Sequence, residues 1–412
     1  MNNAERVTFG DDSTLKRLNI VHLISNVGQG SFGLGPVALN LAREQEVQGN
    51  RATVWSLDGE ADRQWAAESS GLNISRIRCF SQSVPHLLRW SREMERMAIA
   101  DAANISIVHF HALWTGMSRI PNQLRSRHAI PTVVTPHGAL QKWALKKSRW
   151  KKEIALALYD RANLNNAACF HAVGENEIAD IRDFGLKNPI AVIPNGIPND
   201  WLVSSGDGAA FRQQHGIAAD RRVLLFLSRI TPKKGLPMLL DAMEGLRPAL
   251  ASWILVLAGA DEFGHQAEVE AIIRKRGLSD VVIMPGPLFG QAKRDAFAAA
   301  ELFVLPSYSE GAPIVILEAL GAGVPVLATK ASPWPQLVTH GCGWWTEIEA
   351  GFIADALKNA MGKSQEELHH MGLRGKNYVA EELTWRQASC KTIQMYEWIL
   401  GLGSKPNFVV VN

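Results

Sequence analysis

The chain has 412 residues, more than one hydrophobic core normally organises, so two domains are expected. Hydrophobic residues make up 47% and charged residues 20%, which is typical of a globular protein and excludes a disordered one. The formal net charge of +3 is too small to indicate a partner such as nucleic acid. The four cysteines form no Cys-x-x-Cys pair, so no zinc site and no disulfide framework is expected.

The first sixteen residues are polar and contain acids, unlike a secretory signal or a transit peptide. Apolar runs stay shorter than the roughly 18 to 20 residues that span a bilayer. We therefore expect a cytoplasmic protein that contacts a membrane only peripherally, at the inner face of the plasma membrane.

Short, nearly continuous apolar runs alternate with helical stretches along the chain. Such runs indicate strands buried on both faces, which is typical of a parallel sheet covered by helices. The fold class is therefore expected to be α/β, with two doubly wound, Rossmann-like domains. The predicted strands fall in two series, separated by a polar stretch at 203–208: first 18–25, 52–57, 105–110, 131–135, 168–173 and 190–193, then 223–227, 254–258, 281–284, 302–305 and 324–328.

A glycine-rich segment follows the first predicted strand. Gly33 and Gly35 precede a predicted helix that includes Val37, where glycines allow close approach to a ligand and helix N–H groups favour an anion. A plain flexible loop is the alternative. Gly28, Gly30 and Gly33 have the spacing G-x-G-x-x-G, so a dinucleotide-binding turn is another alternative. The motifs described below favour a different enzyme class over an NAD-dependent oxidoreductase.

The sequence Pro136-His137-Gly138 stands at the end of a predicted buried strand. Ligands of open α/β sheets bind at the carboxyl ends of the strands, so His137 is expected to touch substrate. His111 stands at a similar strand end and is the weaker candidate, because a lone histidine is more often structural.

Two cations, Arg229 and Lys234, flank a proline-containing turn directly after the strand at 223–227. Arginine offers a bidentate fork and lysine a point charge, so the two side chains are able to converge on one diphosphate. Two solvated surface charges are the alternative, which a strand end followed by Gly235 makes less favourable.

Two carboxylates frame the turn after the strand at 302–305. Glu310 lies in the loop, and Glu318 lies about one turn inside the following helix. The alternative role of Glu318 is to stabilise that helix by a favourable interaction with its dipole. Amides at this helix start are free to meet phosphate or hydroxyl oxygens. The segment that we expect to bind the donor here is Gly311, Ala312, Pro313 and Ile314.

Glu310 and Glu318, with seven residues between them, resemble the E-x-seven-E motif of retaining GT-B glycosyltransferases of the family 4 type. Further motifs follow the order of that family over essentially the whole chain after Lys16, and the ordered set is specific although each motif alone is weak. They are Gly33-Leu-Gly35-Pro, Pro136-His-Gly138, His171-Ala-Val-Gly-Glu-Asn-Glu177, Ile193-Pro-Asn-Gly196, Ser228-Arg229 to Lys234-Gly235, Leu257-Ala-Gly259, Gly286-Pro-Leu-Phe-Gly290 and Cys342-Gly343-Trp344.

The resemblance implies a catalytic group of His137, Arg229, Lys234 and Glu310. Arg229 and Lys234 would grip the donor diphosphate. Glu310 and His137 would contact the donor sugar.

The resemblance also implies how the rest of the donor is bound. Glu318 would bind the ribose, and the base would lie near Gly286 and Leu288. No metal or other cofactor is expected, in agreement with the absence of a DxD sequence.

The resemblance also implies the domain organisation. Residues 1–200 would form an acceptor-binding domain and residues 201–383 a nucleotide-sugar-binding domain, with a cleft between them. A final helix at about 384–402 would cross back onto the first domain.

A basic, tryptophan-containing segment follows the His137 loop. Cations interleaved with tryptophans suit a membrane interface, although a solvated helix face is the alternative. With the family resemblance, the segment predicts a lipid-linked acceptor such as a polyprenyl diphosphate. Its residues are Lys142, Trp143, Lys146, Lys147, Arg149, Trp150, Lys151 and Lys152.

The leading hypothesis is a retaining hexosyltransferase that uses a UDP- or GDP-sugar to build a surface polysaccharide or exopolysaccharide. A synthase with a soluble sugar acceptor is one alternative. The other alternative is a non-catalytic nucleotide-sugar-binding protein. The presence of all four charged residues of the expected donor site argues against it, because a binding protein would not need every one of Arg229, Lys234, Glu310 and Glu318.

Overall fold

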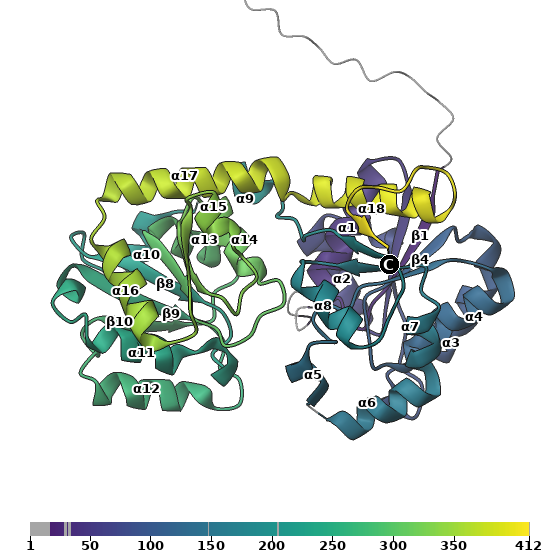
Figure 1. Ribbon diagram of the computed structural model, residues 1–412, viewed down its shortest axis with the longest axis horizontal. Coiled ribbons are helices and arrows are strands. Elements are labelled where there is room, and N and C mark those ends of the chain that lie inside the picture. The colour runs from purple at the N-terminus through teal and green to yellow at the C-terminus, as the bar shows by residue number, and fades with distance from the viewer. Residues whose placement is uncertain (1–16, 29–30, 32–33, 147, 204–205, 412) are drawn as a thin grey trace, which may run out of the picture.

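The computed structural model describes residues 17–28, 31, 34–146, 148–203 and 206–411. Two sheets covered by helices lie side by side, and a pair of long helices runs across both (Figure 1). The strands of the first sheet in spatial order are β14 (Val409–Val410), β7 (Ile190–Val192), β6 (Cys169–Ala172), β5 (Thr132–Val134), β4 (Ile107–Phe110), β1 (Asn19–Leu23), β2 (Arg51–Ser56) and β3 (Ile77–Cys79). The first sheet is parallel except for the edge strand β14, which pairs antiparallel with β7.

The second sheet is parallel throughout. In both sheets the chain starts near the middle and winds outward in both directions, which is the doubly wound, Rossmann-like topology. The strands of the second sheet in spatial order are β10 (Val282–Gly286), β9 (Trp253–Ala258), β8 (Arg222–Leu227), β11 (Leu302–Leu305), β12 (Val326–Thr329) and β13 (Gly343–Thr346).

Helices connect the strands of each sheet. The predicted boundary near residue 200 falls between the last parallel strand of the first sheet and the first strand of the second. Helices of the first domain are α1 (Leu34–Val47), α2 (Glu60–Ser70), α3 (Arg92–Ala100), α4 (Arg119–His128), α5 (Lys142–Lys146), α6 (Arg149–Ala155), α7 (Arg161–Asn165) and α8 (Asn176–Asp183). Those of the second are α9 (Asp200–Val203), α10 (Gly208–Gln214), α11 (Leu236–Glu244), α12 (His265–Lys275), α13 (Gly290–Ala299), α14 (Ile314–Gly321), α15 (Gln336–Thr339) and α16 (Ala350–Met361).

Two long helices, α17 (Gln365–Glu382) and α18 (Trp385–Ile399), carry the chain back from the second domain to the first. Thr384 lies between them, and its side chain accepts a hydrogen bond from Gln387 N, which caps α18. Helix α18 packs on α1, and its residues Trp385, Met395 and Tyr396 are buried in the core of the first domain. The predicted crossing helix is therefore confirmed.

Each predicted strand is present, and the structure adds β3, β13 and β14. The first sheet has apolar clusters on both faces, and a third cluster fills the second domain. Burial of both faces explains why these strands read as continuous apolar runs. None of the helices in the described part of the chain is both long and apolar enough to cross a membrane.

Candidate functional site

Loops at the carboxyl ends of three strands meet between the two domains. They follow β8 and β11 in the second domain and β5 in the first. Gln141 Nε2 donates to the backbone oxygen of Glu310 at 3.2 Å, and Lys233 Nζ lies 5.2 Å from the ring centre of Trp143. The predicted site residues of the two domains therefore lie close together, and we call this region the interdomain site.

The loop after β8 places Lys234 against the loop after β11. Pro232 to Lys234 form a short 3-10 turn that ends at Gly235, whose φ of +68° is a left-handed conformation. A Cβ added to Gly235 would lie 2.1 Å from the backbone oxygen of Pro306. Only glycine permits this close approach of the two loops.

Lys234 and Glu310 form a buried ion pair. Lys234 Nζ lies 2.6 Å from Glu310 Oε1, and the two side chains are only 9% and 8% exposed. Ser307 Oγ donates to the same carboxylate oxygen at 2.5 Å, and the Glu310 amide donates to Ala331 O at 3.1 Å. Burial of a charge is costly unless it is paired and hydrogen-bonded, and both conditions are met here.

Further cations surround this pair. Burial lowers the pKa of Lys233, Glu310 raises it, and the positive charges of Lys234 and Arg229 lower it again. These four charged groups therefore interact electrostatically. We call Arg229, Lys233, Lys234 and Glu310 the charged cluster. Arg229 also contacts both carboxylate oxygens of Glu262 at 2.8 Å, a partner that the sequence did not predict.

Glu318 projects from α14 and is paired with a residue that the sequence reading missed. Lys293 Nζ of α13 lies 2.6 Å from its carboxylate, and the two side chains are 21% and 13% exposed. Ahead of α14, the amides of Gly311, Ala312 and Ile314 donate to no acceptor within the described residues. Pro313 has no N–H and occupies the N-cap position.

The predicted base-binding segment ends β10 beside these loops. Gly286 has a φ of +86° and accepts a hydrogen bond from Gly259 N at 3.0 Å. A Cβ on Gly259 would lie 1.8 Å from Ser228 O, so the loop after β9 and the loop after β8 touch through their backbones. Leu288 is partly buried against the core of the second domain.

His137 lies in the first-domain loop after β5 and has a φ of +50°, a conformation that non-glycine residues rarely adopt. The next residue, Gly138, donates to Glu177 Oε1 at 2.5 Å, while the other oxygen of Glu177 accepts from Val173 N at 2.9 Å. Burial raises the pKa of Glu177 to about 7. Burial also lowers the pKa of His137 to about 3, so its imidazole is neutral at physiological pH.

The predicted glycine loop is described only in part. Gly33 lies outside the described residues, whereas Gly35 is buried in the first turn of α1. A Cβ on Gly35 would lie 2.2 Å from Ser31 Oγ, so a larger residue would collide there. Upstream, Val27 N donates to Asp58 Oδ2 at 2.6 Å, which anchors the start of the loop.

The basic segment forms the short helices α5 and α6, and Lys147 lies outside the described residues. Trp143 is directed at Lys233 of the second domain, whereas Trp150 is 61% exposed with Lys151 over its ring. The other cations lie along both helices, and several contact neighbouring groups. Lys142 pairs with Asp183 and Arg149 with Glu153, Lys152 donates to the backbone oxygen of Ala144, and Lys146 is exposed.

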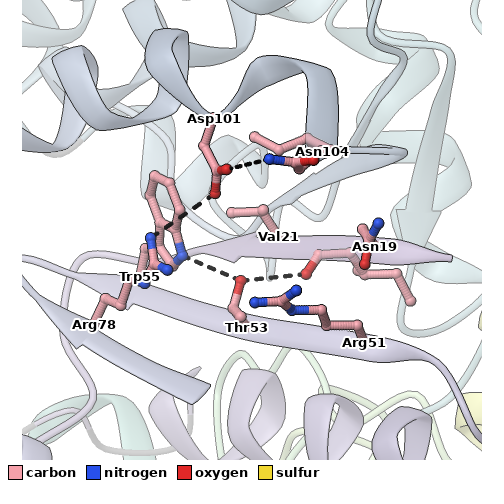
Figure 2. Close-up of a pocket in the computed structure, with 10 residues that line it drawn as sticks. Asn19, Val21, Arg51, Thr53, Trp55, Arg78, Asp101 and Asn104 are labelled. Atoms are coloured by element: carbon pink, nitrogen blue, oxygen red, sulfur yellow. Dashed lines mark hydrogen bonds and ion pairs between the residues drawn. The ribbon is translucent and has the colours of Figure 1, made fainter. Parts of the chain in front are cut away.

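A small depression of about 190 Å³ lies elsewhere, beside β1 and β2 of the first sheet (Figure 2). Its polar groups bond to one another. Trp55 Nε1 donates to Thr53 Oγ1 at 3.1 Å, and Asp101 accepts from Asn104 Nδ2 at 2.8 Å. None of the predicted site residues lines it.

The chain matches two family models that together cover most of its length. Residues 207–378 match the model described as Glycosyl transferases group 1, and residues 32–196 match the Glycosyl transferase 4-like domain. The chain is a glycosyltransferase of this family. The predicted family membership and enzyme class are thereby confirmed.

Relatives in other organisms carry glycosyltransferase names. A D-inositol 3-phosphate glycosyltransferase of Streptomyces scabiei is 28% identical over 260 residues, which span 50% of this chain and 58% of that relative. EpsF of Bacillus subtilis, provisionally described as a glycosyltransferase, is 28% identical over 348 residues, or 82% of this chain and 84% of EpsF.

A solved structure of Anabaena HepE in complex with UDP and glucose has a TM-score of 0.74 and 20% identity, covering 92% of this chain and 99% of HepE. At this identity the likeness concerns the fold alone. Together with the two doubly wound sheets and the crossing helix, it confirms the predicted GT-B fold class.

Proposed function

We propose that this glycosyltransferase transfers a hexose from a UDP- or GDP-sugar, with retention of the anomeric configuration. The observation that supports this most is the charged cluster at the carboxyl ends of the second sheet. Lys234 and Glu310 form a buried pair there, with Lys233 and Arg229 close enough to act on each other electrostatically. Fixed cations in a site of low exposure suit the diphosphate of a nucleotide sugar.

In the proposed reaction the bond between the sugar anomeric carbon and the diphosphate breaks. The acceptor oxygen bonds to that carbon on the same face, and its proton passes to a diphosphate oxygen. Arg229 and Lys234 stabilise the negative charge that develops on the departing nucleoside diphosphate. Because side-chain cations supply this charge, we propose that the reaction needs no metal ion.

Other residues of the interdomain site hold the donor in the proposed complex. Glu310 accepts hydrogen bonds from sugar hydroxyls, and the amides of Gly311, Ala312 and Ile314 donate to sugar and phosphate oxygens. Glu318 accepts from the ribose hydroxyls. Several of these groups bond to protein partners in the structure, so donor binding exchanges one set of partners for another.

Donor binding is tested first. Isothermal titration with UDP, GDP and their sugars, each with and without EDTA, measures affinity and metal dependence in one series. We expect one nucleoside diphosphate to bind with equal affinity in both conditions. Binding of neither UDP nor GDP, nor of their sugars, would contradict the donor site, and binding abolished by EDTA would contradict metal independence.

For the acceptor we propose a glycan or polyprenyl-diphosphate-linked sugar in surface or exopolysaccharide synthesis. Trp150, Ile154 and Leu158 are 61%, 50% and 68% exposed at intervals of four residues, so they share one helix face. A pocket of about 290 Å³ lies beside α5 and α6. Its walls combine apolar residues with three cations and one acid: Trp114, Leu145, Leu156 and Phe184 with Lys146, Arg149, Lys152 and Glu153.

Exposed apolar side chains beside cations suit a membrane surface that bears anionic groups, at the inner face of the plasma membrane. Liposome co-sedimentation with anionic vesicles tests this. Replacing Lys146, Lys147, Lys151 and Lys152 by Glu should abolish binding, and Trp150→Ala should weaken it. Phe352→Ala removes a 49% exposed ring from the second domain and serves as the control.

Turnover separates the remaining alternatives. Release of nucleoside diphosphate with lipid-linked but not soluble sugar acceptors is expected. Release with soluble acceptors alone would favour a synthase of the sucrose or glycogen type. Donor binding with no release under any acceptor would favour a non-catalytic nucleotide-sugar-binding protein.

A further inference from the structure

Five histidines are gathered on and beside the first sheet. His22 lies on β1, His109 on β4 and His171 on β6, while His111 and His137 follow β4 and β5. The rings form a nearly continuous stack, with centroids 4.2 Å apart for His109 and His111, 5.2 Å for His22 and His111, and 5.5 Å for His111 and His137. The sequence predicted His137 as a site residue and His111 as a weaker candidate, and neither prediction explains why five histidines gather here.

Three of these histidines form a hydrogen-bonded chain that starts at Gln45 of α1. Gln45 Oε1 lies 2.8 Å from His22 Nε2, and His22 Nδ1 lies 2.9 Å from His111 Nε2. His111 Nδ1 in turn lies 3.2 Å from His137 Nε2. The chain therefore runs from the first-domain core to the interdomain site.

His109 belongs to a separate branch. Its Nδ1 lies 2.5 Å from the Tyr396 hydroxyl of α18, and its Nε2 lies 2.6 Å from Thr135 Oγ1. No ring nitrogen of His109 is thus needed for the chain from Gln45 to His137. Thr135 therefore serves as a control residue, because its hydroxyl bonds to His109 and to no histidine of the chain from Gln45 to His137.

A metal site is the competing interpretation, since ligand atoms of His22, His109 and His111 lie within 4.8 Å of one another. Each imidazole would have to direct an unoccupied lone pair at the ion. All six ring nitrogens of these three residues already have hydrogen-bond partners. The geometry therefore favours a hydrogen-bonded network.

The histidines of the chain are neutral. Burial lowers the pKa of His22 to about 4 and that of His137 to about 3, and it holds the pKa of His111 well below its usual value. A neutral imidazole has one N–H donor and one acceptor nitrogen. Each hydrogen bond in the chain thus decides the proton position in the next ring.

The direction of the chain follows from Gln45. Its amide oxygen accepts from His22 Nε2, which leaves His22 Nδ1 as an acceptor for His111 Nε2–H. His111 Nδ1 then accepts from His137 Nε2–H.

We propose that Gln45, His22 and His111 are positioning residues that fix His137 in the Nε2–H tautomer. The lone pair of His137 Nδ1, which bonds to no other described residue, then accepts a hydrogen bond from a hydroxyl of the donor sugar. The sugar contact rests on the proposed function, whereas the tautomer does not. The two parts can therefore fail separately.

The tautomer is measured by NMR of protein labelled with 15N-histidine at pH 7, where the ring nitrogens report which one carries the proton. His137 signals are assigned by their loss in His137→Asn. We expect one Nε2–H species in the wild type and mixed tautomers in Gln45→Met, which has similar volume but no acceptor. Gln45→Glu keeps an acceptor and Thr135→Val alters only the His109 branch, so both should retain the wild-type pattern.

An Nδ1–H species in the wild type, or an unchanged pattern in Gln45→Met, would overturn the proposal. So would signals that change on EDTA treatment, because they would indicate a bound metal. If Gln45→Met fails to fold, the wild-type spectrum still tests the direction of the chain.

Function is tested by comparing two ligands. Gln45→Met should bind the nucleotide sugar roughly fivefold to tenfold more weakly while binding the nucleoside diphosphate, which lacks the sugar, as the wild type does. Equal weakening of both would indicate general damage and overturn the positioning role. If no nucleotide binds any variant, the proposed function fails while the NMR result still decides the tautomer.

Discussion

The two sides of the interdomain site bury their polar groups in different charge states. On the second-domain side, Lys234 and Glu310 keep their charges and compensate each other at 2.6 Å. On the first-domain side, His137 and the histidines behind it lose their charge, because burial lowers their pKa. One side is thus a fixed electrostatic cluster, and the other a neutral hydrogen-bonding network.

This difference matches the two halves of a nucleotide sugar. A diphosphate is stabilised by cations, whereas sugar hydroxyls are recognised by neutral donors and acceptors of defined direction. The comparison predicts that the two sides respond differently to mutation, acid and salt.

The largest effect is expected from Lys234→Ala. The substitution removes the proposed diphosphate contact and leaves Glu310 as an unpaired buried carboxylate. We expect kcat/KM to fall by about 10²–10³, as for loss of one charge-stabilising group. The free energy of unfolding, measured in urea, should fall by about 3–5 kcal/mol.

The double variant Lys234→Ala with Glu310→Gln, compared with Glu310→Gln alone, separates the two losses, since Glu310 is itself a proposed catalytic residue. The double variant removes both charges, so most of the stability should return while activity stays low. Recovery of activity along with stability would show that Lys234 acts only through folding.

The next effect is the loss of stability in acid from the first-domain side. The pKa of His22 and of His171 is lowered from 6.5 to about 4 in the fold, so the unfolded chain takes up these protons first. Their contribution is complete above pH 6.5 and is lost as the pH falls toward 4. Asp160 and Glu177, whose pKa burial raises to about 7, act in the opposite direction over this range.

Because the histidines outnumber these carboxyls, the free energy of unfolding should fall by about 2 kcal/mol or more between pH 6.5 and 4.5. Urea midpoints across this range measure it, and His171→Asn should flatten the decline. A midpoint that stays constant would contradict the neutral burial of the histidines.

The smallest effect concerns the cation–π contact between Lys233 and Trp143, which joins the two sides. Trp143→Ala removes the ring near Lys233 and should raise the KM for the nucleotide sugar about twofold to fivefold, because such contacts are worth about 0.5–1 kcal/mol. Trp150→Ala is the matched control and should leave this KM unchanged, since its ring contacts Lys151 instead. Equal effects of both would show that the basic segment acts as one surface.

The charged residues of the second domain could be placed at strand ends from the sequence because their motifs are local. Glu310 and Glu318 belong to one strand–turn–helix unit, and Arg229 and Lys234 belong to another, so short motifs place them at strand ends. The strands of both sheets were predictable for the same reason, since burial on two faces leaves a continuous apolar run. The two-residue edge strand β14 gives no such signal.

The sequence did not predict the partners that come from distant parts of the chain. Glu262 lies 33 residues from Arg229, and Lys293 lies 25 residues from Glu318, so no local spacing pairs them. The histidine network joins β1, β4 and the loop after β5 through side chains. A histidine inside an otherwise apolar strand, such as His22 or His171, was the available signal.

The crossing helix also constrains the order in which the protein is made. The core of the first domain includes Trp385, Met395, Tyr396 and Val409, which leave the ribosome after the second domain. The second-domain core ends at Leu383. It is therefore complete while the first domain still lacks helix α18. The first half of the chain to be synthesised is therefore the last to become fully packed, and its exposed apolar face is the part of the nascent protein that most needs protection from aggregation.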